Sequence, residues 1–503
     1  MNYFFDYDII ILLIRCSFKS IEGIKLFYYE EAEARGNSSE LENLPELLCE
    51  IIQYFRNYLS TLYSCVLVNK LWCRLAIPLL WEDPFSIYAQ NFQFIDIYLC
   101  NLNEDDKTKF NEYVKQKLVN MESISNCSST LFNYYSFIKC LNTHKVVCSI
   151  EKWRSALMNG KQLDLSILVY RLLFKMFIEN EGNLHSFEVE VRTSNDCNCL
   201  KDIMELILQN PNFNCNIRNL MFSIDVIDLN IKIFSLLKFL CFNCNSISSF
   251  YIGYEFKASN YTLFEKCLTQ TFNTQQNLEK ISFECDDFVL YNLFSSLKNS
   301  SISNTLKIIT FYKIDFKKII NNIQEIFNQL NILETIHIIY CSALNSDFVQ
   351  QIINVIRPFK LKSLILSHHP FQVESLQLLL QKFGSDLENF EFGKYNFSDE
   401  SKQKLFKSII EYCTKIKYFS LKDINFNLAL NLIENIKKQN LNYLNISFDY
   451  YGDDYKSENL GQILPTKLEF LKLDNIKSSD LKKFFKILLS KGYLLELKFN
   501  GNI

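Results

Sequence analysis

Hydrophobic positions recur in one short pattern along the C-terminal part of the chain. From Leu184 onward, an apolar residue is followed by two variable residues, a second apolar residue, one variable residue and a third apolar residue. Twelve copies begin at Leu184, Ile217, Ile247, Leu278, Leu306, Leu333, Leu361, Leu387, Ile416, Leu441, Leu468 and Leu494. Because side chains alternate along a strand, positions four and six of each copy face the same way. The pattern therefore predicts short strands with an apolar pair facing inward and position one packed behind it.

The residues between these strands leave room for a helix in each copy. From Leu278 onward, successive copies start 25 to 29 residues apart. Apolar spacing predicts helices over Phe348–Ile356, Val373–Phe383 and Leu428–Ile436. This consensus and period resemble the leucine-rich repeat. The resemblance implies an α/β solenoid over residues 184–503, of about twelve units, with parallel strands inside and helices outside.

Position nine of the copies departs from the leucine-rich repeat, in which an Asn or Cys side chain satisfies the turn backbone. Only Cys341 and Asn502 match. The other turns are expected to be satisfied in some other way. Because the sequence ends inside the last copy, we expect the final strand edge to be covered by a partner or to be short.

Positions three, five and seven of the copies should face away from the core, on the concave side of the solenoid. The candidate target-binding residues there are Tyr312, His337, Ile365, Tyr418, Tyr443 and Phe470. Polar neighbours of alternating sign accompany them, among them Lys280, Glu391 and Lys472. Aromatic anchors among mixed charges are typical of a protein-binding face. The alternative is that they are ordinary exposed residues of an aromatic-rich chain.

Near the N-terminus, Leu44–Trp81 predicts three short helices. Pro45 suits the first turn of the first helix, whose apolar stripe runs from Leu47 to Phe55. Ser60 or Thr61 is expected to cap the second helix, and Asn69 the third. A segment of this size cannot bury so much apolar surface within itself, so either the rest of the chain or a partner must cover the surplus.

This segment resembles the F-box. The matching features are Leu44-Pro45-Glu46, the apolar first helix, the stretch Val68 to Trp72, and Leu80-Trp81. The resemblance implies docking to the Skp adaptor of a Skp–cullin–F-box ubiquitin ligase. The residues expected to contact the adaptor are Leu44, Pro45, Leu48, Ile51, Ile52, Leu67, Val68 and Trp72.

Two functions follow from these resemblances. In the first, the chain is a substrate-recognition subunit that holds the adaptor through the F-box and a protein target through the concave repeat face. In the second, it is a leucine-rich-repeat scaffold or inhibitor without a ubiquitin role, whose N-terminal helices only cap the first repeat. The sequence does not identify the target.

The patterns divide the chain into four parts. Residues 1–40 form an extension of unknown role, 41–84 the F-box, 85–183 a helical linker and 184–503 the repeats. The helices expected in the linker are Phe92–Leu99, Lys107–Leu118, Leu131–Leu141 and Leu163–Ile178. The apolar run Ile9 to Ile14 is too short to span a bilayer and lacks the flanks of a signal peptide.

Composition narrows the class of protein further. Hydrophobic residues make up 48% and charged residues 22%, which is globular, and a net charge of −3 is not the basic footprint of a nucleic-acid binder. The 17 cysteines are scattered without a framework, which favours reduced thiols in a cytoplasmic or nuclear protein. We expect neither nucleic acid nor a membrane as partner.

No catalytic or cofactor motif stands out. The sequence has no phosphate-cradling glycine loop, dinucleotide fingerprint or nucleophile elbow, so we expect no enzymatic activity and no cofactor. Cys197-x-Cys199 and Cys241-x-x-Cys244 invite a zinc site. The two pairs lie in different repeat units and one has the wrong spacing, so we favour buried thiols at turns and no metal.

Overall fold

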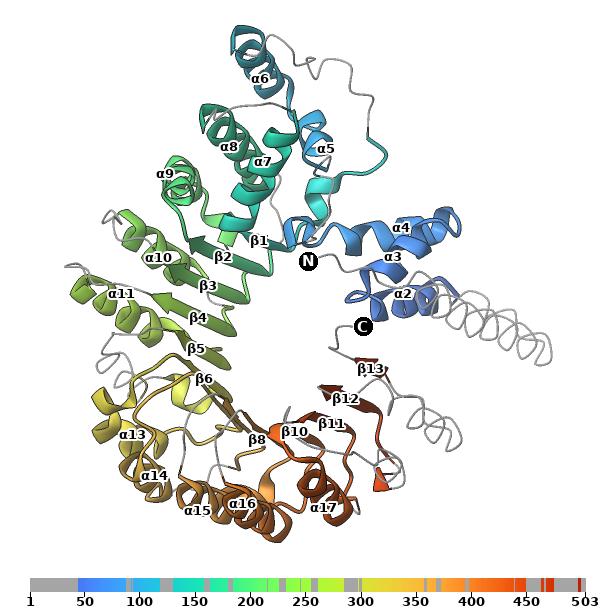
Figure 1. The fold of residues 1–503 in the computed structure, drawn as a ribbon. Helices are drawn as coiled ribbons and strands as arrows, with labels where there is room; N and C mark the ends of the chain where they lie inside the picture. The colour runs from blue at the N-terminus through green and yellow to red at the C-terminus, as the bar shows by residue number, and fades with distance from the viewer. Residues whose placement is uncertain are drawn as a thin grey trace. The chain divides into compact units, whose positions relative to one another are not determined.

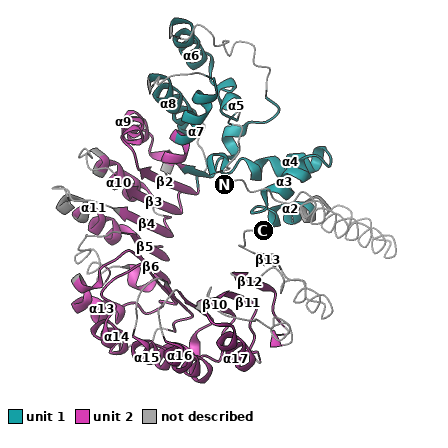
Figure 2. Ribbon diagram, in the orientation of Figure 1, with its two compact units in different colours: residues 1–141, 148–184 teal, residues 142–147, 185–503 magenta. Residues whose placement is uncertain are grey.

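The structure of the full chain is a computed structural model. The structure describes residues 44–86, 92, 94–117, 130–157, 163–179, 184–214, 216–225, 232–244, 246–254, 261–284, 297, 301–356, 360–367, 372–393, 398–437, 439–448, 463–465, 467–474 and 496–498. The predicted extension over residues 1–40 lies outside them. The chain divides into two compact units, residues 1–141 with 148–184 and residues 142–147 with 185–503 (Figure 2). The predicted F-box and most of the predicted linker belong to unit 1, so the boundary between them stays a prediction.

Unit 1 begins with the three predicted helices, α2 (Leu44–Tyr54), α3 (Leu59–Val66) and α4 (Lys70–Leu80). Asn69 caps α4 as expected, because its side chain accepts hydrogen bonds from the backbone of Leu71 and Trp72. Neither expected cap of α3 is used, since that helix already begins at Leu59 after Tyr58, whose side chain makes no capping bond. The core of the bundle is built from Ile52, Leu62, Cys65, Trp72, Ala76, Leu79 and Leu80.

The rest of unit 1 is mostly helical. Its elements include η1 (Pro84–Ser86), α5 (Phe94–Cys100), α6 (Glu104–Lys117), η3 (Tyr134–Phe137) and α8 (Leu163–Glu179). Helix α7 (Thr143–Leu157) begins in unit 2 and continues in unit 1. The predicted helix Leu131–Leu141 is wrong. The short 3-10 turn η3 and strand β1 (Cys140–Asn142) occupy this stretch.

Long-range contacts join the parts of unit 1. The carboxylate of Glu82 accepts hydrogen bonds from Arg56 at 3.2 Å and from Lys139 at 2.6 Å. The Trp81 ring, at the end of α4, packs on Tyr134 with centroids 4.2 Å apart. Buried Asp106 on α6 pairs with Lys175 on α8 at 2.7 Å. The C-terminal end of the three-helix segment is therefore fixed to the remainder of this unit.

Unit 2 is built on the predicted strands, which lie in one sheet in chain order (Figure 1). They are β2 (Ser186–Val191), β3 (Asn219–Ile224), β4 (Ser249–Tyr254), β5 (Lys280–Glu284), β6 (Ile308–Tyr312), β7 (Thr335–Ile339), β8 (Ser363–Ser367), β9 (Asn389–Phe392), β10 (Tyr418–Ile424), β11 (Tyr443–Phe448), β12 (Phe470–Asp474) and β13 (Glu496–Lys498). Neighbouring strands from β2 to β13 pair in parallel. Each predicted copy is a strand, so the α/β repeat fold is confirmed.

Helices cover one side of this sheet (Figure 1). They are α9 (Ser194–Gln209), α10 (Lys232–Asn243), α11 (Tyr261–Thr274), α13 (Ile320–Phe327), α14 (Ser346–Ile353), α15 (Val373–Phe383), α16 (Asp399–Tyr412) and α17 (Phe426–Ile436), with 3-10 turns η4 (Pro211–Asn214), η5 (Ser301–Asn304), η6 (Phe316–Lys318) and η7 (Gly384–Asp386). Helix α15 has the predicted bounds, whereas α14 and α17 each begin two residues before the predicted start. We call the other side the helix-free face; it is the face expected to bind a target.

The core of unit 2 follows the predicted positions. In the copy at Leu278, that residue, Ile281 and Phe283 are each 0% exposed. The register places the same positions of successive copies side by side, and the rings of Phe283 and Phe311 stack with centroids 6.0 Å apart. Burying such a side chain contributes about 1.5–3 kcal/mol. Repeated burial of this kind holds each repeat to its neighbours.

Cys341 satisfies a turn backbone, as its position in the repeat predicts. Its sulfur accepts from the backbone N–H of Ile314 at 3.5 Å and donates to the carbonyl oxygen of Phe311 at 3.4 Å. Both partners belong to the preceding copy. Burial raises the pKa of the Cys341 thiol to about 12, so the group stays a neutral thiol at neutral pH. The second predicted match, Asn502, lies outside the described residues.

Candidate functional site

The three-helix segment leaves apolar side chains uncovered on one face of α3. Leu59, Tyr63 and Leu67 follow one another at four-residue spacing, which places them on one side of a helix. They are 38%, 51% and 85% exposed, and the neighbouring Val68 and Leu71 are 38% and 45% exposed. We call these five residues the exposed stripe. The opposite side of α3 holds Leu62 and Cys65, which are buried.

The predicted adaptor-binding residues fall into different environments. Leu67 and Val68 are exposed and lie in the stripe, whereas Leu48 and Ile51 are half-buried. Leu44 and Pro45 form the first turn of α2. They remain candidate contacts.

Two of the predicted contacts need correction. Ile52 and Trp72 are only 1% and 3% exposed, because they close the core of the bundle. Their side chains support the surface rather than form it. Apolar spacing alone did not identify Leu59, Tyr63 and Leu71 as surface residues, although the four-residue spacing of the first two is a usable signal.

On the helix-free face, three of the predicted target-binding residues form one ladder of rings. Tyr418, Tyr443 and Phe470 occupy position three of successive copies and are register partners. The Tyr418 and Tyr443 centroids are 4.5 Å apart, and those of Tyr443 and Phe470 are 4.2 Å apart, with interplanar angles of 24° and 9°. All three are half-buried. We call them the ring ladder.

A charged group adjoins the ring ladder. The Tyr418 hydroxyl donates to Glu391 Oε2 at 3.1 Å, and Lys422 Nζ donates to Oε1 of the same carboxylate at 2.9 Å. Burial, together with the nearby Glu391 carboxylate, raises the pKa of Tyr418. The phenol therefore stays protonated and keeps the first ring oriented toward β9.

His337 and Ile365 lie on the same face, at position five of adjacent strands. Thr310 Oγ1 is 3.5 Å from His337 Nδ1. Burial, reinforced by the positive charge of Lys280, lowers the pKa of His337 below its ordinary value. Ile365 is in turn the register partner of Glu391, which connects this pair to the ring ladder.

Tyr312 lies apart from that group, at the end of β6. Its ring packs edge-on against Tyr340 with centroids 5.4 Å apart, and Lys313 Nζ lies 5.2 Å from the Tyr312 centroid. Lys313 and Tyr340 have left-handed backbones, with φ of 53° and 54°, which is unusual for residues with side chains. The structure thus gathers five of the six predicted residues along β7–β12 and leaves Tyr312 in a separate aromatic contact.

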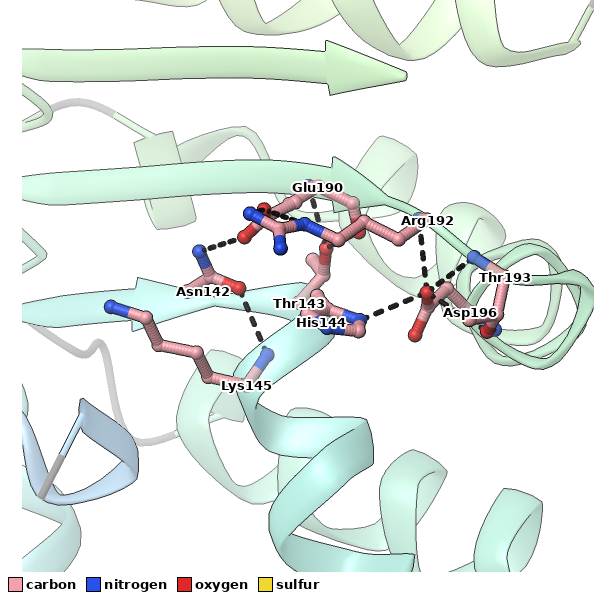
Figure 3. Close-up of polar contacts among 8 residues, drawn as sticks. All are labelled: Asn142, Thr143, His144, Lys145, Glu190, Arg192, Thr193 and Asp196. Atoms are coloured by element: carbon pink, nitrogen blue, oxygen red, sulfur yellow. Dashed lines mark hydrogen bonds and ion pairs between the residues drawn. The ribbon is translucent and has the colours of Figure 1, made fainter. Parts of the chain in front are cut away.

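A buried polar network that the sequence patterns missed lies at the N-terminal end of unit 2 (Figure 3). Thr143 Oγ1 donates to the Glu190 carbonyl at 2.8 Å and accepts from the Glu190 N–H at 2.9 Å. Asn142 Nδ2 donates to Glu190 Oε2 at 2.6 Å, and Arg192 pairs with the other oxygen of that carboxylate. The network joins the start of α7 to β2.

Asp196 forms the second half of this network. Its Oδ2 lies 2.9 Å from His144 Nδ1 and accepts from the backbone N–H of Thr193 at 2.8 Å, within the capping box that starts α9 (Figure 3). The Thr193-x-x-Asp196 spacing was a usable signal for this helix start. These bonds satisfy backbone and charged groups of the first repeat, so we assign the network a structural role.

The cysteine pairs do not converge on a metal. Cys197, Cys199, Cys241 and Cys244 are all buried. The expectation that they lie at turns is wrong for three of them, since Cys197 and Cys199 lie in α9 and Cys241 in α10. Within the described part of the chain, no group of three or more His, Cys, Asp or Glu residues could hold a metal ion. No helix among those residues is long and apolar enough to cross a bilayer.

Comparison with known proteins identifies no family for this chain. No protein-family model matches the sequence, and no curated protein matches it either. One similar solved structure is the crystal structure of the Rad7 and Elc1 complex in yeast. The matching chain is 15% identical, with 71% of this chain and 96% of that chain covered and a TM-score of 0.32. At this TM-score the likeness supports no argument about function.

Proposed function

We propose that this chain is the substrate-recognition subunit of a Skp–cullin–F-box ubiquitin ligase. In this proposal the three-helix segment binds the Skp adaptor, and the helix-free face of the repeats binds a protein target. The chain itself carries out no catalytic step and acts in the cytoplasm or nucleus.

The exposed stripe is the observation that supports the proposal best. The interior of the three-helix segment is closed by Ile52, Leu62 and Trp72, so the uncovered apolar residues on α3 are not needed to complete its core. Exposed apolar residues that follow one face of a helix are typical of a surface that docks a partner. The segment also has the residue order that resembles the F-box.

The ring ladder and its neighbours support target binding. Aromatic side chains with limited rotational freedom contribute strongly at protein interfaces, because little side-chain entropy is lost on binding. Here the stack of rings already fixes Tyr418, Tyr443 and Phe470, and Glu391 with Lys422 supplies charge beside them. His337 and Ile365 extend the same face.

Co-purification of the full chain with the Skp adaptor tests the proposal. Leu67→Asp and Tyr63→Asp each place a charge in the exposed stripe without touching the buried core, and we expect each to abolish co-purification. Leu131→Asp is the matched control, because Leu131 belongs to unit 1 and is 91% exposed. Absence of adaptor binding by the unmodified chain would instead favour the scaffold or inhibitor without a ubiquitin role.

A further inference from the structure

Two acceptor oxygens near the ring ladder are buried and have no hydrogen-bond donor. Asn445 is 9% exposed. Its Nδ2 donates to Ser420 Oγ at 3.1 Å, while its Oδ1 has no partner. Asp474 Oδ2 pairs with Lys472 Nζ at 3.0 Å, while its Oδ1 has no partner. Buried polar atoms of this kind are rare in folded proteins, and each one calls for an explanation.

Both oxygens belong to the helix-free face of adjacent strands. Asn445 is the register partner of Lys472, and Asp474 lies two residues further along β12. The strand alternation that places Phe470 on this face also places Lys472 and Asp474 there. The two acceptors therefore lie on the same side of the ring ladder, two residues beyond Tyr443 on β11 and four residues beyond Phe470 on β12.

Two aromatic rings of the ladder, Tyr443 and Phe470, lie on the same strands as these acceptors. Tyr443 is stacked between Tyr418 and Phe470, so both of its faces are covered. Phe470 packs one face on Tyr443 and is half-buried, so it supplies apolar surface at the end of the ladder. Such a surface suits the methylene stem of a long side chain whose polar head reaches beyond it.

We propose that the acceptor site, formed by Tyr443, Asn445, Phe470, Lys472 and Asp474, binds an arginine side chain of the target protein. The proposal rests on target binding by the helix-free face. It follows from donor complementarity, since the two unpaired atoms are both acceptors, and one belongs to a carboxylate whose other oxygen pairs with Lys472. A guanidinium supplies five donors and a positive charge at the end of an apolar stem. In this proposal the guanidinium takes the place of the Lys472 ammonium beside Asp474.

Other ligand classes fit less well. An acidic peptide or a nucleic-acid phosphate brings further acceptors, which would leave Asn445 and Asp474 unpaired. A lysine brings the charge, but its ammonium is a compact group that does not span two separated acceptors in one plane. The arginine proposal therefore predicts an order of affinity, with arginine above lysine and lysine above neutral or acidic side chains.

Ligand-observed NMR titration of the full chain with short peptides tests this inference. The probes are acetylated peptides of Gly, Ser and Ala with one central arginine, lysine, citrulline or glutamate. We expect saturable binding of the arginine peptide. Asp474→Asn, which keeps the size of the side chain, should weaken that binding by about tenfold, because it removes the charge from the hydrogen bond. Phe242→Ala, an exposed aromatic residue of α10, should leave binding unchanged.

The outcomes separate this inference from the proposed function. Equal binding of the arginine and glutamate peptides, or an arginine affinity unaffected by Asp474→Asn, would overturn the arginine site. Equal binding of the citrulline peptide would also overturn it, since citrulline keeps donors but lacks the charge. None of these results bears on co-purification with the Skp adaptor, which depends on the exposed stripe in the other unit.

Discussion

The three-helix segment of unit 1 and the helix-free face of unit 2 both present apolar side chains, but in different ways. The exposed stripe leaves Leu67 85% exposed and Tyr63 51% exposed. The ring ladder keeps its aromatic residues half-buried and stacked on one another. Binding free energy at the stripe would therefore come mainly from covering apolar area. At the ladder it would come mainly from side chains that are already oriented, because little entropy is lost on binding.

The sharpest contrast within unit 1 is between its core and its stripe. Trp72→Ala should destabilise the three-helix segment by about 3–5 kcal/mol, because Trp72 is 3% exposed and fills the centre of the bundle. Leu67→Ala should change stability by less than about 0.5 kcal/mol. Thermal melts and limited proteolysis of the two variants compare them. Similar melting behaviour in both would mean that core and surface have been assigned wrongly.

In unit 2, the corresponding comparison is between the stability cost of a substitution in the sheet core and of one in the ring ladder. Leu444→Ala should cost about 2–5 kcal/mol, because Leu444 is 0% exposed and packs between repeats. Tyr443→Phe keeps the stacked ring and should cost less than about 1 kcal/mol. Urea denaturation followed by far-UV circular dichroism measures both. A larger loss for the tyrosine variant would contradict the packing described for this face.

The two units should also respond to acid at different pH. The pKa of His337 is lowered by burial, so unit 2 is stabilised above about pH 6.5 and loses this contribution as the pH falls through the folded-state pKa. The pKa of Asp106 is also lowered: burial opposes this, but the hydrogen bond and charge of Lys175 outweigh it. Its contribution to unit 1 is present above about pH 4 and is lost at lower pH.

Melts of the full chain between pH 7 and pH 3 check this order. His337→Gln should remove part of the loss at the higher pH, and Asp106→Asn part of the loss at the lower pH. Asp106→Asn should also cost about 1–3 kcal/mol near neutral pH, because it weakens a charged hydrogen bond to Lys175. An unchanged pH profile in both variants would contradict these assignments.

A small effect, of opposite sign to the core substitutions, is expected at Tyr98 in unit 1. Its side chain is 0% exposed, and its hydroxyl has no hydrogen-bond partner. Tyr98→Phe removes that hydroxyl and keeps the ring contacts with Trp81 and Phe177. We expect stability to stay level or to rise by up to about 1 kcal/mol. A clear loss of stability would indicate a hydrogen bond to this hydroxyl.

The repeat fold could be predicted from the sequence because the same spacing of apolar residues recurs in every copy. The strands of unit 2 share one alternation of buried and surface positions. Counted from the copy starts, Tyr418, Tyr443 and Phe470 all fall at position three, and they are register partners. Their stacking follows from parallel register alone.

Other features could not be predicted because they join residues that are distant in sequence. Apolar spacing identifies Trp72 as a helix-face residue, but only the packing of α3 against α4 determines that it is buried. The bonds of Thr143 to Glu190 span 47 residues and follow no repeat. The unpaired oxygens of Asn445 and Asp474 emerge only from side-chain geometry.

Hydrogen–deuterium exchange of the full chain, with and without saturating purified Skp adaptor, shows whether the exposed stripe binds the adaptor. We expect slower backbone exchange over residues 59–71, which include the exposed stripe, and unchanged exchange in strands β10–β12. Equal exchange over residues 59–71 with and without the adaptor would rule out docking at the stripe.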